Sequence, residues 1–247
     1  MNAVFVRLLG EVGVGPDRST VVTVRGKTAR AVVAHLAIAA GGLLSTDSLM
    51  GEIWDDPPES ARNAIQVAVS GLRKEHGPGF VLSSSTGYRL PLDTVRIDLA
   101  EANALLISAE RLLANGHLDE ATIRVTDALS LFTGETLTGL DGHSVTVARR
   151  RAADLHHRAR LLQARCFGRS SDHLAAIDVL REATASEPLD EAAHIELMRA
   201  LTAVGRRGEA LQASETLRLR LQTELGIAPS DRLLDVVEEL AHPSRTT

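Results

Sequence analysis

Cysteine is nearly absent from this sequence. Cys166 is the one cysteine among 247 residues, so the chain cannot form an internal disulfide. Its apolar neighbours Leu161, Leu162 and Phe167 predict a buried thiol rather than a nucleophile. A chain that does without disulfides fits a reducing compartment, and we expect a cytoplasmic protein.

Long hydrophobic runs are also missing. The longest apolar run, Ala31 to Leu44, contains His35 and two glycines and is shorter than the roughly 20 residues that span a bilayer. The first residues, MNAVFVRLLGEVG, lack the basic start, the long apolar stretch and the small-residue cleavage site of a signal peptide. We therefore expect no membrane segment and no membrane partner.

The sequence has no excess of positive charge. Its formal net charge is −5, whereas a DNA-binding protein usually carries a cationic surface. The charge is unevenly divided, because residues 1–92 hold 9 basic and 8 acidic residues while residues 93–247 hold 18 and 24. Any DNA contact must therefore come from a local cluster in the first part, made of Arg62, Arg73, Lys74 and Arg89.

The first 92 residues predict short strands, three helices and a hairpin. Residues 4–14 and 21–24 are rich in β-branched residues and flank the turn GPDRS, which predicts two antiparallel strands. Helical periodicity begins near Lys27 and ends at Gly41, and Ser45 is the expected N-cap of a second helix that ends at DDPP. A third helix and the hairpin FVLSSSTGYRLPL follow. This is the order of a winged helix-turn-helix, in which the third helix reads DNA and the hairpin is the wing.

The predicted third helix, residues 59–77, has a narrow apolar stripe. An arc of about 100° holds its apolar side chains, which are Ala61, Ile65, Ala68, Val69 and Leu72. The opposite side carries cationic and amide side chains, namely Arg62, Asn63, Gln66, Ser70, Arg73 and Lys74. A solvated helix face usually mixes both signs of charge, and an ordinary solvated face stays the alternative. Arg, Gln and Asn make bidentate contacts with guanine and adenine in the major groove, which makes this face the candidate reader.

Three stretches of this region are RGKTARAVVAHLAIAAGG, LLSTDSLMGEIWDDPPESARNAIQVAVSGLRK and STGYRL. They resemble the DNA-binding domain of the AfsR/DnrI/RedD-type SARP activators, which is similar to the winged helix of OmpR-type response regulators. Trp54 with the following DDPP, and ARN-x-x-Q at the start of the third helix, are the strongest matches. Ala68 and Gly71 depart from the family, which more often has an aromatic and a further basic residue there.

From Leu92 onward the sequence predicts helices almost throughout, with a repeat. Ala176 and Ala210 lie 34 residues apart and are each followed seven residues later by Ala183 or Leu217, and Pro188 lies twelve residues after Ala176. This is the tetratricopeptide pattern of small residues where paired helices cross, and three helical pairs are the expected count. The expected turns between helices are residues 116–121 and 205–210.

The segments ERLLANGHLDEA, ATASEPLDEAAHIELMRALTAVGRRGEAL and LRLRLQTELGIAPS resemble the bacterial transcriptional activator domain that follows the winged helix in SARP proteins. We therefore predict a mainly α fold with short antiparallel strands. Its parts are a winged-helix DNA-binding domain over residues 1–92, a tetratricopeptide-like domain over 93–242 and a frayed tail at 243–247. The family's usual aromatics in the helical domain are largely replaced, which disfavours a ligand site based on stacking.

The resemblance implies a DNA-binding transcriptional activator that is not an enzyme and uses no cofactor. It also implies a homodimer on promoter DNA with direct repeats, and recruitment of RNA polymerase, through a sigma factor or another subunit, at a gene cluster for a specialised metabolite such as an antibiotic. The candidate DNA-binding residues are Arg62, Asn63, Gln66, Ser70, Arg73 and Lys74 on the third helix and Ser85, Thr86 and Arg89 on the wing. The candidate polymerase contact is the acidic loop with Asp55, Asp56 and Glu59.

Motifs for catalysis and metal binding are incomplete. Residues 26–28, GKT, resemble the end of a phosphate-binding loop, but the glycine required five residues earlier is Val21. His156 and His157 are neighbours on a predicted helix and point about 100° apart, so they cannot easily face one ion. We expect no catalytic residue and no metal site, and we expect Trp54 to belong to the core.

Two alternative functions stay open. The chain could be a tetratricopeptide-type protein-interaction or ligand-sensing regulator whose winged helix is only a protein-binding module. It could also be a repressor that uses the same DNA-binding domain.

Overall fold

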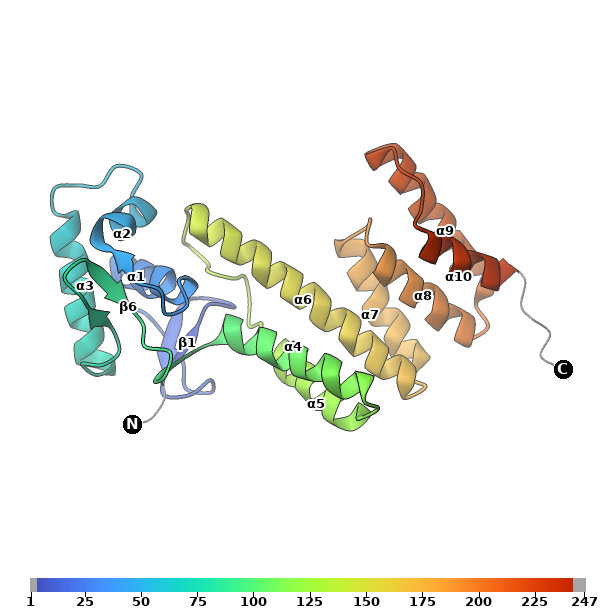
Figure 1. Ribbon diagram of the computed structural model, residues 1–247, viewed down its shortest axis with the longest axis horizontal. Helices are drawn as coiled ribbons and strands as arrows, with labels where there is room; N and C mark the ends of the chain where they lie inside the picture. The colour runs from blue at the N-terminus through green and yellow to red at the C-terminus, as the bar shows by residue number, and fades with distance from the viewer. Residues whose placement is uncertain (1–3, 242–247) are drawn as a thin grey trace. The chain divides into compact units, whose positions relative to one another are not determined.

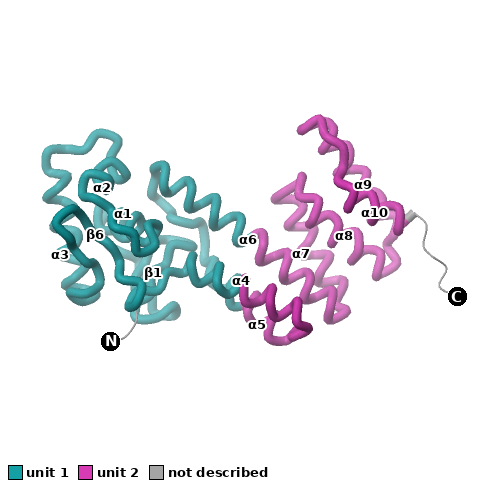
Figure 2. Tube along the Cα trace, viewed as in Figure 1, with its two compact units in different colours: residues 1–105, 127–156 teal, residues 106–126, 157–247 magenta. Residues whose placement is uncertain are grey.

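The computed structural model describes residues 4–241, which form two compact units (Figure 2). One unit is the chain up to residue 105 together with residues 127–156, and the other is residues 106–126 together with the chain from residue 157. The boundaries fall within three helices, α4 (Asp98–Ala114), α5 (Leu118–Leu129) and α6 (His143–Arg169). The division into domains at residue 92 stays a prediction, and the tail expected at 243–247 lies outside the described residues.

A four-stranded sheet opens the first unit, in the order β3-β2-β1-β7. Strands β1 (Val4–Arg7), β2 (Gly13–Gly15) and β3 (Val22–Thr23) are antiparallel, and β7 (Val95–Ile97) pairs parallel to β1. The predicted strand over residues 4–14 is therefore wrong in one respect, because it is two strands. The prediction of helices from Leu92 onward misses β7.

One buried carboxylate accounts for the break between β1 and β2. The Leu8 amide donates to both oxygens of Asp98 at 2.9 and 2.8 Å, and the Leu9 amide donates to Oδ2 at 2.7 Å. Asp98 has no exposed surface and also accepts a hydrogen bond from the Leu99 amide at 2.7 Å. Because these two amides bond a side chain, they cannot donate to a neighbouring strand, and β1 ends at Arg7. Burial raises the pKa of Asp98 to about 6, against the lowering effect of these backbone hydrogen bonds and of Arg7.

Three helices and a small sheet confirm the predicted winged helix (Figure 1). The helices are α1 (Lys27–Ile38), α2 (Thr46–Ile53) and α3 (Ala61–His76). Ser45 caps α2 as predicted, since its Oγ accepts a hydrogen bond from the Ser48 amide at 3.0 Å. The sheet has the order β4-β6-β5 and consists of β4 (Leu44–Ser45), β5 (Leu82–Ser83) and β6 (Gly87–Arg89). At Gly87 a Cβ would lie 2.7 Å from the Leu44 carbonyl carbon, so β4 can pair there only with glycine.

Further helices follow in sequence. They are α7 (His173–Ser186), α8 (Glu191–Ala203), α9 (Arg207–Arg220), a π-helical turn η1 (Leu221–Leu225) and α10 (Asp231–Ala241). The repeat positions Ala176, Ala183, Ala210 and Leu217 are all buried. The two predicted turns join α4 to α5 and α8 to α9, where Gly116 and Gly205 have φ values of 83° and 77° that favour glycine.

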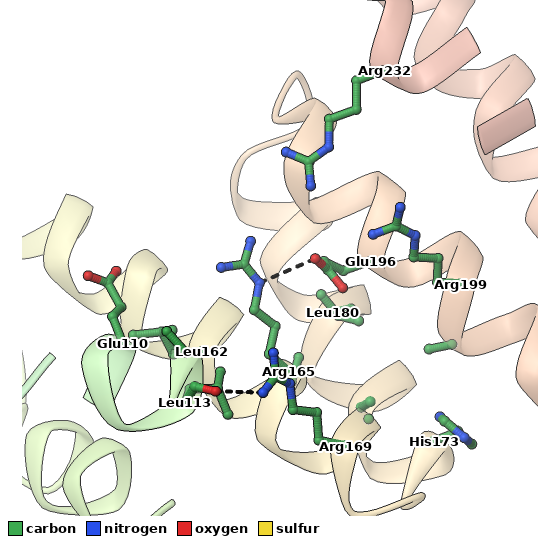
Figure 3. Close-up of a pocket in the computed structure, with 15 residues that line it drawn as sticks. Glu110, Leu113, Leu162, Arg165, Arg169, His173, Leu180, Glu196, Arg199 and Arg232 are labelled. Atoms are coloured by element: carbon green, nitrogen blue, oxygen red, sulfur yellow. Dashed lines mark hydrogen bonds and ion pairs between the residues drawn. The ribbon is translucent and has the colours of Figure 1, made fainter. Parts of the chain in front are cut away.

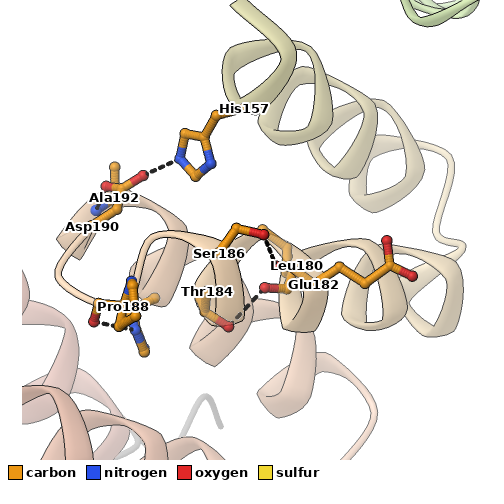
Figure 4. A network of polar contacts seen from close by, with 9 residues as sticks. His157, Leu180, Glu182, Thr184, Ser186, Pro188, Asp190 and Ala192 are labelled. Carbon is orange, nitrogen blue, oxygen red and sulfur yellow. Dashed lines mark hydrogen bonds and ion pairs between the residues drawn. The ribbon is translucent and has the colours of Figure 1, made fainter. Parts of the chain in front are cut away.

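Polar contacts fix the turn between α7 and α8 (Figure 4). Asp190 caps α8 by accepting a hydrogen bond from the Ala192 amide at 2.8 Å. The other oxygen of Asp190 lies 2.6 Å from His157 Nε2 on α6. His194 Nε2 lies 3.2 Å from the carbonyl oxygen of Pro188, and burial lowers the pKa of this imidazole. The turn is thereby attached to α8 and to α6.

Two further sequence expectations can be compared with the described residues. Cys166 is buried, as predicted, and burial raises the pKa of its thiol. Within residues 4–241, no helix combines the length and the apolar character needed to cross a membrane.

Candidate nucleic-acid interface

Helix α3 packs one face on α1 and α2. The side chains of Ala61, Ile65, Val69 and Leu72 on this face are at most 2% exposed. Ala68, which was expected in the same stripe, is half-buried at its edge. The stripe fixes the rotation of the helix, because burying these residues leaves the opposite face in solvent.

The exposed face of α3 carries most of the predicted DNA-binding residues. Arg62, Asn63, Gln66, Ser70 and Lys74 are all exposed. At about 100° per residue, Asn63 and Ser70 lie near the middle of the exposed arc, with Arg62 and Gln66 toward one edge. This face therefore presents amides, a hydroxyl and cations to solvent.

Val67 lies on this face and was missed by the sequence argument. Its side chain is 64% exposed, so an aliphatic group stands in solvent on this face. An aliphatic side chain that lies among polar side chains on such a face suits contact with the methyl group of thymine. Its position between Asn63 and Ser70 on the helix was the signal in the sequence that it shares their exposed face.

Arg62 has an acidic neighbour from another helix. Its Nη2 lies 2.6 Å from Asp47 Oδ1, and Asp47 stands in the first turn of α2. Both side chains are more than half exposed, so the pair contributes little to stability. Asp47 thus brings a carboxylate beside this face from α2, a contact that the spacing of residues along α3 could not predict.

Arg73 connects α3 to the hairpin. Its Nε and Nη2 donate to the Val81 carbonyl oxygen at 2.8 and 2.7 Å, and Nη2 also donates to Ser83 Oγ at 2.5 Å. The residue is half-buried because it lies beside Val69 at the edge of the buried stripe. The guanidinium holds the start of the hairpin against the C-terminal half of α3, which positions the wing relative to the helix.

The tip of the hairpin is ordered by its own hydrogen bonds. Ser84 Oγ accepts from the amides of Thr86 and Gly87, both at 3.2 Å, and the Ser84 amide donates to the Gly87 carbonyl at 2.8 Å. Ser85, Thr86 and Arg89 are exposed. The three predicted wing residues thus lie at the surface of a hairpin that Arg73 joins to α3.

The acidic loop between α2 and α3 is exposed at Asp55, Asp56 and Glu59. Trp54 precedes it, is half-buried and lines a cavity of about 440 Å³ together with His35 and Glu52. The loop ends at Ala61, the first residue of α3, whose amide donates a hydrogen bond to the Pro58 carbonyl oxygen at 2.8 Å.

A small polar cluster ties the helices of the first unit together. Ser144 at the start of α6 donates from Oγ to Glu52 Oε2 at 2.9 Å, and the same hydroxyl lies 3.0 Å from Nδ1 of His35. His35 is 2% exposed, and burial lowers the pKa of its imidazole. The cluster joins α1, α2 and the first turn of α6 to one another.

No metal site is found among residues 4–241, where no group of three His, Cys, Asp or Glu side chains could hold an ion. The ring of His156 lies edge-on to Phe132 at 4.9 Å between centroids, whereas His157 contacts Asp190. The two histidines therefore have different neighbours.

Gly71 offers a direct test of the helix itself. It lies on the exposed face of α3, and a Cβ added there meets no atom within 4 Å. Gly71→Ala should raise the free energy of unfolding by up to about 1 kcal/mol, since alanine restricts the unfolded chain and favours the helix. Urea unfolding followed by Trp54 fluorescence measures the change. A decrease in stability would mean that the position is not an unstrained helix interior.

Comparison with known proteins identifies the family. The profile described as "Bacterial transcriptional activator domain" matches residues 97–241. The regulatory protein DnrI of Streptomyces peucetius is 30% identical over 92% of this chain and 88% of its own length. The chain belongs to the SARP family.

Other similar proteins agree with this SARP assignment. The regulatory protein AfsR of Streptomyces coelicolor is 32% identical over 94% of this chain, which spans only 24% of AfsR. The structure of Mycobacterium tuberculosis EmbR in complex with a low affinity phosphopeptide superposes with a TM-score of 0.87. It is 25% identical, and the match covers 100% of this chain and 67% of the EmbR chain. DnrI, AfsR and EmbR are regulators by name, and the fold shared with EmbR is a winged helix followed by a helical domain.

Proposed function

We propose that this SARP protein is a sequence-specific DNA-binding transcriptional activator that acts in the cytoplasm. The observation that carries the proposal is the exposed face of α3, where Asn63, Gln66 and Arg62 stand in solvent beside a hairpin that Arg73 holds in place. A helix with such a face and an attached wing has the form that enters a major groove. The family of the chain supports the same function.

Base reading is assigned to the N-terminal half of α3. Arg62, Asn63 and Gln66 are the readers, because the first turns of a recognition helix lie deepest in the groove. Lys74 and the wing residues Ser85, Thr86 and Arg89 contact phosphates. Ser70 lies between the two groups, and Arg73 acts as a positioning residue through its hydrogen bonds to Val81 and Ser83.

Asp47 modulates this surface. In the free protein it pairs with Arg62 at 2.6 Å, and a base or phosphate that takes up Arg62 must replace that contact. An exposed pair costs little to break, so the arginine is available to DNA. The carboxylate also repels phosphate, which restrains non-specific binding.

Activation is assigned to RNA polymerase recruitment through the acidic loop. Asp55, Asp56 and Glu59 stand exposed between α2 and α3 and are suited to a basic patch on a sigma factor or another polymerase subunit. The protein binds as a homodimer to direct repeats, at the promoters of a specialised-metabolite cluster such as an antibiotic cluster.

Electrophoretic mobility shifts with promoter fragments from the neighbouring genes test DNA binding. Sequence-specific retardation that weakens as salt rises supports the proposal. No retardation at low salt would favour a protein-interaction or ligand-sensing regulator instead. Loss of neighbouring transcripts after gene deletion supports an activator, and a rise in those transcripts would indicate a repressor.

Charge reversal in the loop separates activation from binding. Asp55→Lys with Asp56→Lys should abolish promoter-dependent transcription in a purified system, while affinity for the promoter stays equal or increases, because the added charges attract phosphate. Asp154→Lys, another exposed aspartate, is the control and should leave transcription unchanged. Loss of DNA binding in the loop variant would assign the loop a structural role.

A further inference from the structure

The second unit contains a cavity of about 690 Å³ with a wall rich in arginine (Figure 3). Arg165 and Arg169 reach it from α6, Arg199 from α8 and Arg232 from α10. Between the arginines the lining is apolar, formed by Leu113, Leu162, Ala164, Ala176, Leu180 and Ala200. A volume of this size lies within the range of roughly 300–1,000 Å³ that is typical of small-molecule sites.

The charges of this cavity are unbalanced. Two glutamates line it, and each is already engaged. Glu110 accepts a hydrogen bond from Arg158 Nε at 2.7 Å, and Glu196 lies 3.2 Å from Arg165 Nε. Four arginines thus face two paired carboxylates, in a part of the chain where acidic residues outnumber basic ones by 24 to 18.

Two of the arginines are held in place and two are available. Arg169 Nη1 donates to the Leu113 carbonyl at 2.5 Å, and Arg165 is fixed by Glu196. Within residues 4–241, Arg199 and Arg232 form no hydrogen bond or ion pair with another side chain or with the backbone. Figure 3 shows both of them directed toward the side of the cavity where Arg165 and Glu196 meet.

A structural role does not explain this arrangement. Like charges from three helices repel one another when they converge, and Arg199 and Arg232 gain no partner in return. Arginine presents a rigid fork of donors that matches a carboxylate or a phosphate group in two parallel hydrogen bonds. The arginines therefore suit an anion, and the apolar lining suits the carbon body of an organic one.

We propose that this cavity binds a small organic anion that carries at least two carboxylate or phosphate groups. Arg199 and Arg232 bind one anionic group, Arg165 and Arg169 bind the other, and the apolar residues pack on the body of the molecule. The inference is independent of DNA binding by α3. It gives the helical domain a ligand that is recognised by charge rather than by stacking on aromatic rings.

Isothermal titration of the full chain with citrate and with pyrophosphate, at low salt, tests the proposal. The wild-type chain should bind at least one of these probes at one site, and the stronger probe shows whether carboxylate or phosphate is preferred. The double variant Arg199→Gln with Arg232→Gln should bind that probe at least about tenfold more weakly, because each lost charged hydrogen bond costs about a factor of ten or more. Both residues are exposed, so the variant should unfold at the wild-type temperature.

The matched control is Arg150→Gln with Arg151→Gln, two exposed arginines of α6 that do not line the cavity. This control removes the same charge and should bind within about twofold of wild type. Equal losses in both double variants would show general attraction of anions and overturn the proposal. It would also be overturned if neither probe bound, or if only a poly-glutamate peptide bound through Arg199 and Arg232, since that would mark a peptide groove.

Discussion

Gln66→Ala should remove sequence preference at one or two base pairs of the operator. Gln66 is exposed about one and a half turns from the start of α3, where its amide can make two hydrogen bonds with one adenine. Loss of such a contact costs about 1 to 3 kcal/mol on the preferred site and little on a scrambled one. Fluorescence anisotropy titrations on a matched and a scrambled duplex, each at two salt concentrations, measure both affinities.

Lys74→Ala is the companion variant and should behave differently. Lys74 is exposed near the C-terminal end of α3, the part of a recognition helix that lies away from the bases and close to the sugar-phosphate backbone of DNA. Its removal should weaken binding to both duplexes by the same factor. It should also lower the slope of log affinity against log salt concentration by about one. If Gln66→Ala and Lys74→Ala both lowered the affinity for the matched and the scrambled duplex by the same factor, α3 would not be the helix that recognises the bases.

Features with a local cause were predictable from the sequence. The cap at Ser45, the buried stripe of α3 and the turns at Gly116 and Gly205 each depend on residues within a few positions of one another. The order of strands, helices and hairpin followed from the same local signals. The resemblance to SARP activators then indicated that these elements form a DNA-binding domain.

Features that join distant segments were not predictable. Arg73 lies on the polar half of the helix and its contact with DNA stays a prediction, but its contacts with Val81 and Ser83 depend on how the hairpin packs. The approach of Asp47 to Arg62 likewise depends on the angle between two helices. Periodicity along one helix contains no information about either contact.

Strand β7 shows the same limit over a longer separation. Residues 95–97 precede a strong helical pattern and are too few to give a period-two signal of their own. They form a strand because β1, some 90 residues earlier, offers them a free edge. Asp98 follows directly and accepts hydrogen bonds from the amides beyond the end of β1. Residues outside the predicted winged-helix domain therefore complete the sheet of the first unit and hold its first strand.

Asp98→Ala should lower the free energy of unfolding of the first unit by about 3 kcal/mol at pH 7. The change leaves the amides of Leu8, Leu9 and Leu99 without the carboxylate that they bond, and each unpaired buried donor costs about 1 to 3 kcal/mol. Relief from burying a charge offsets part of that cost. Urea unfolding followed by the fluorescence of Trp54, the one tryptophan, reports on this unit. Asp93→Ala, at an exposed neighbouring aspartate, should change stability by less than about 0.5 kcal/mol.

The pH dependence of the same site has a definite sign. Burial raises the pKa of Asp98 from 3.8 to about 6, so between these values the folded chain holds a proton that the unfolded chain has released. The part of the stability that depends on this bound proton is therefore fully present below pH 3.8 and is lost as the pH rises through about 6, whereas the backbone hydrogen bonds to the carboxylate remain. Asp98→Asn cannot titrate, so the stability of wild type relative to this variant should fall by about 3 kcal/mol across that window. A relative stability that rises with pH would show that the three backbone hydrogen bonds outweigh burial and keep the carboxylate ionised.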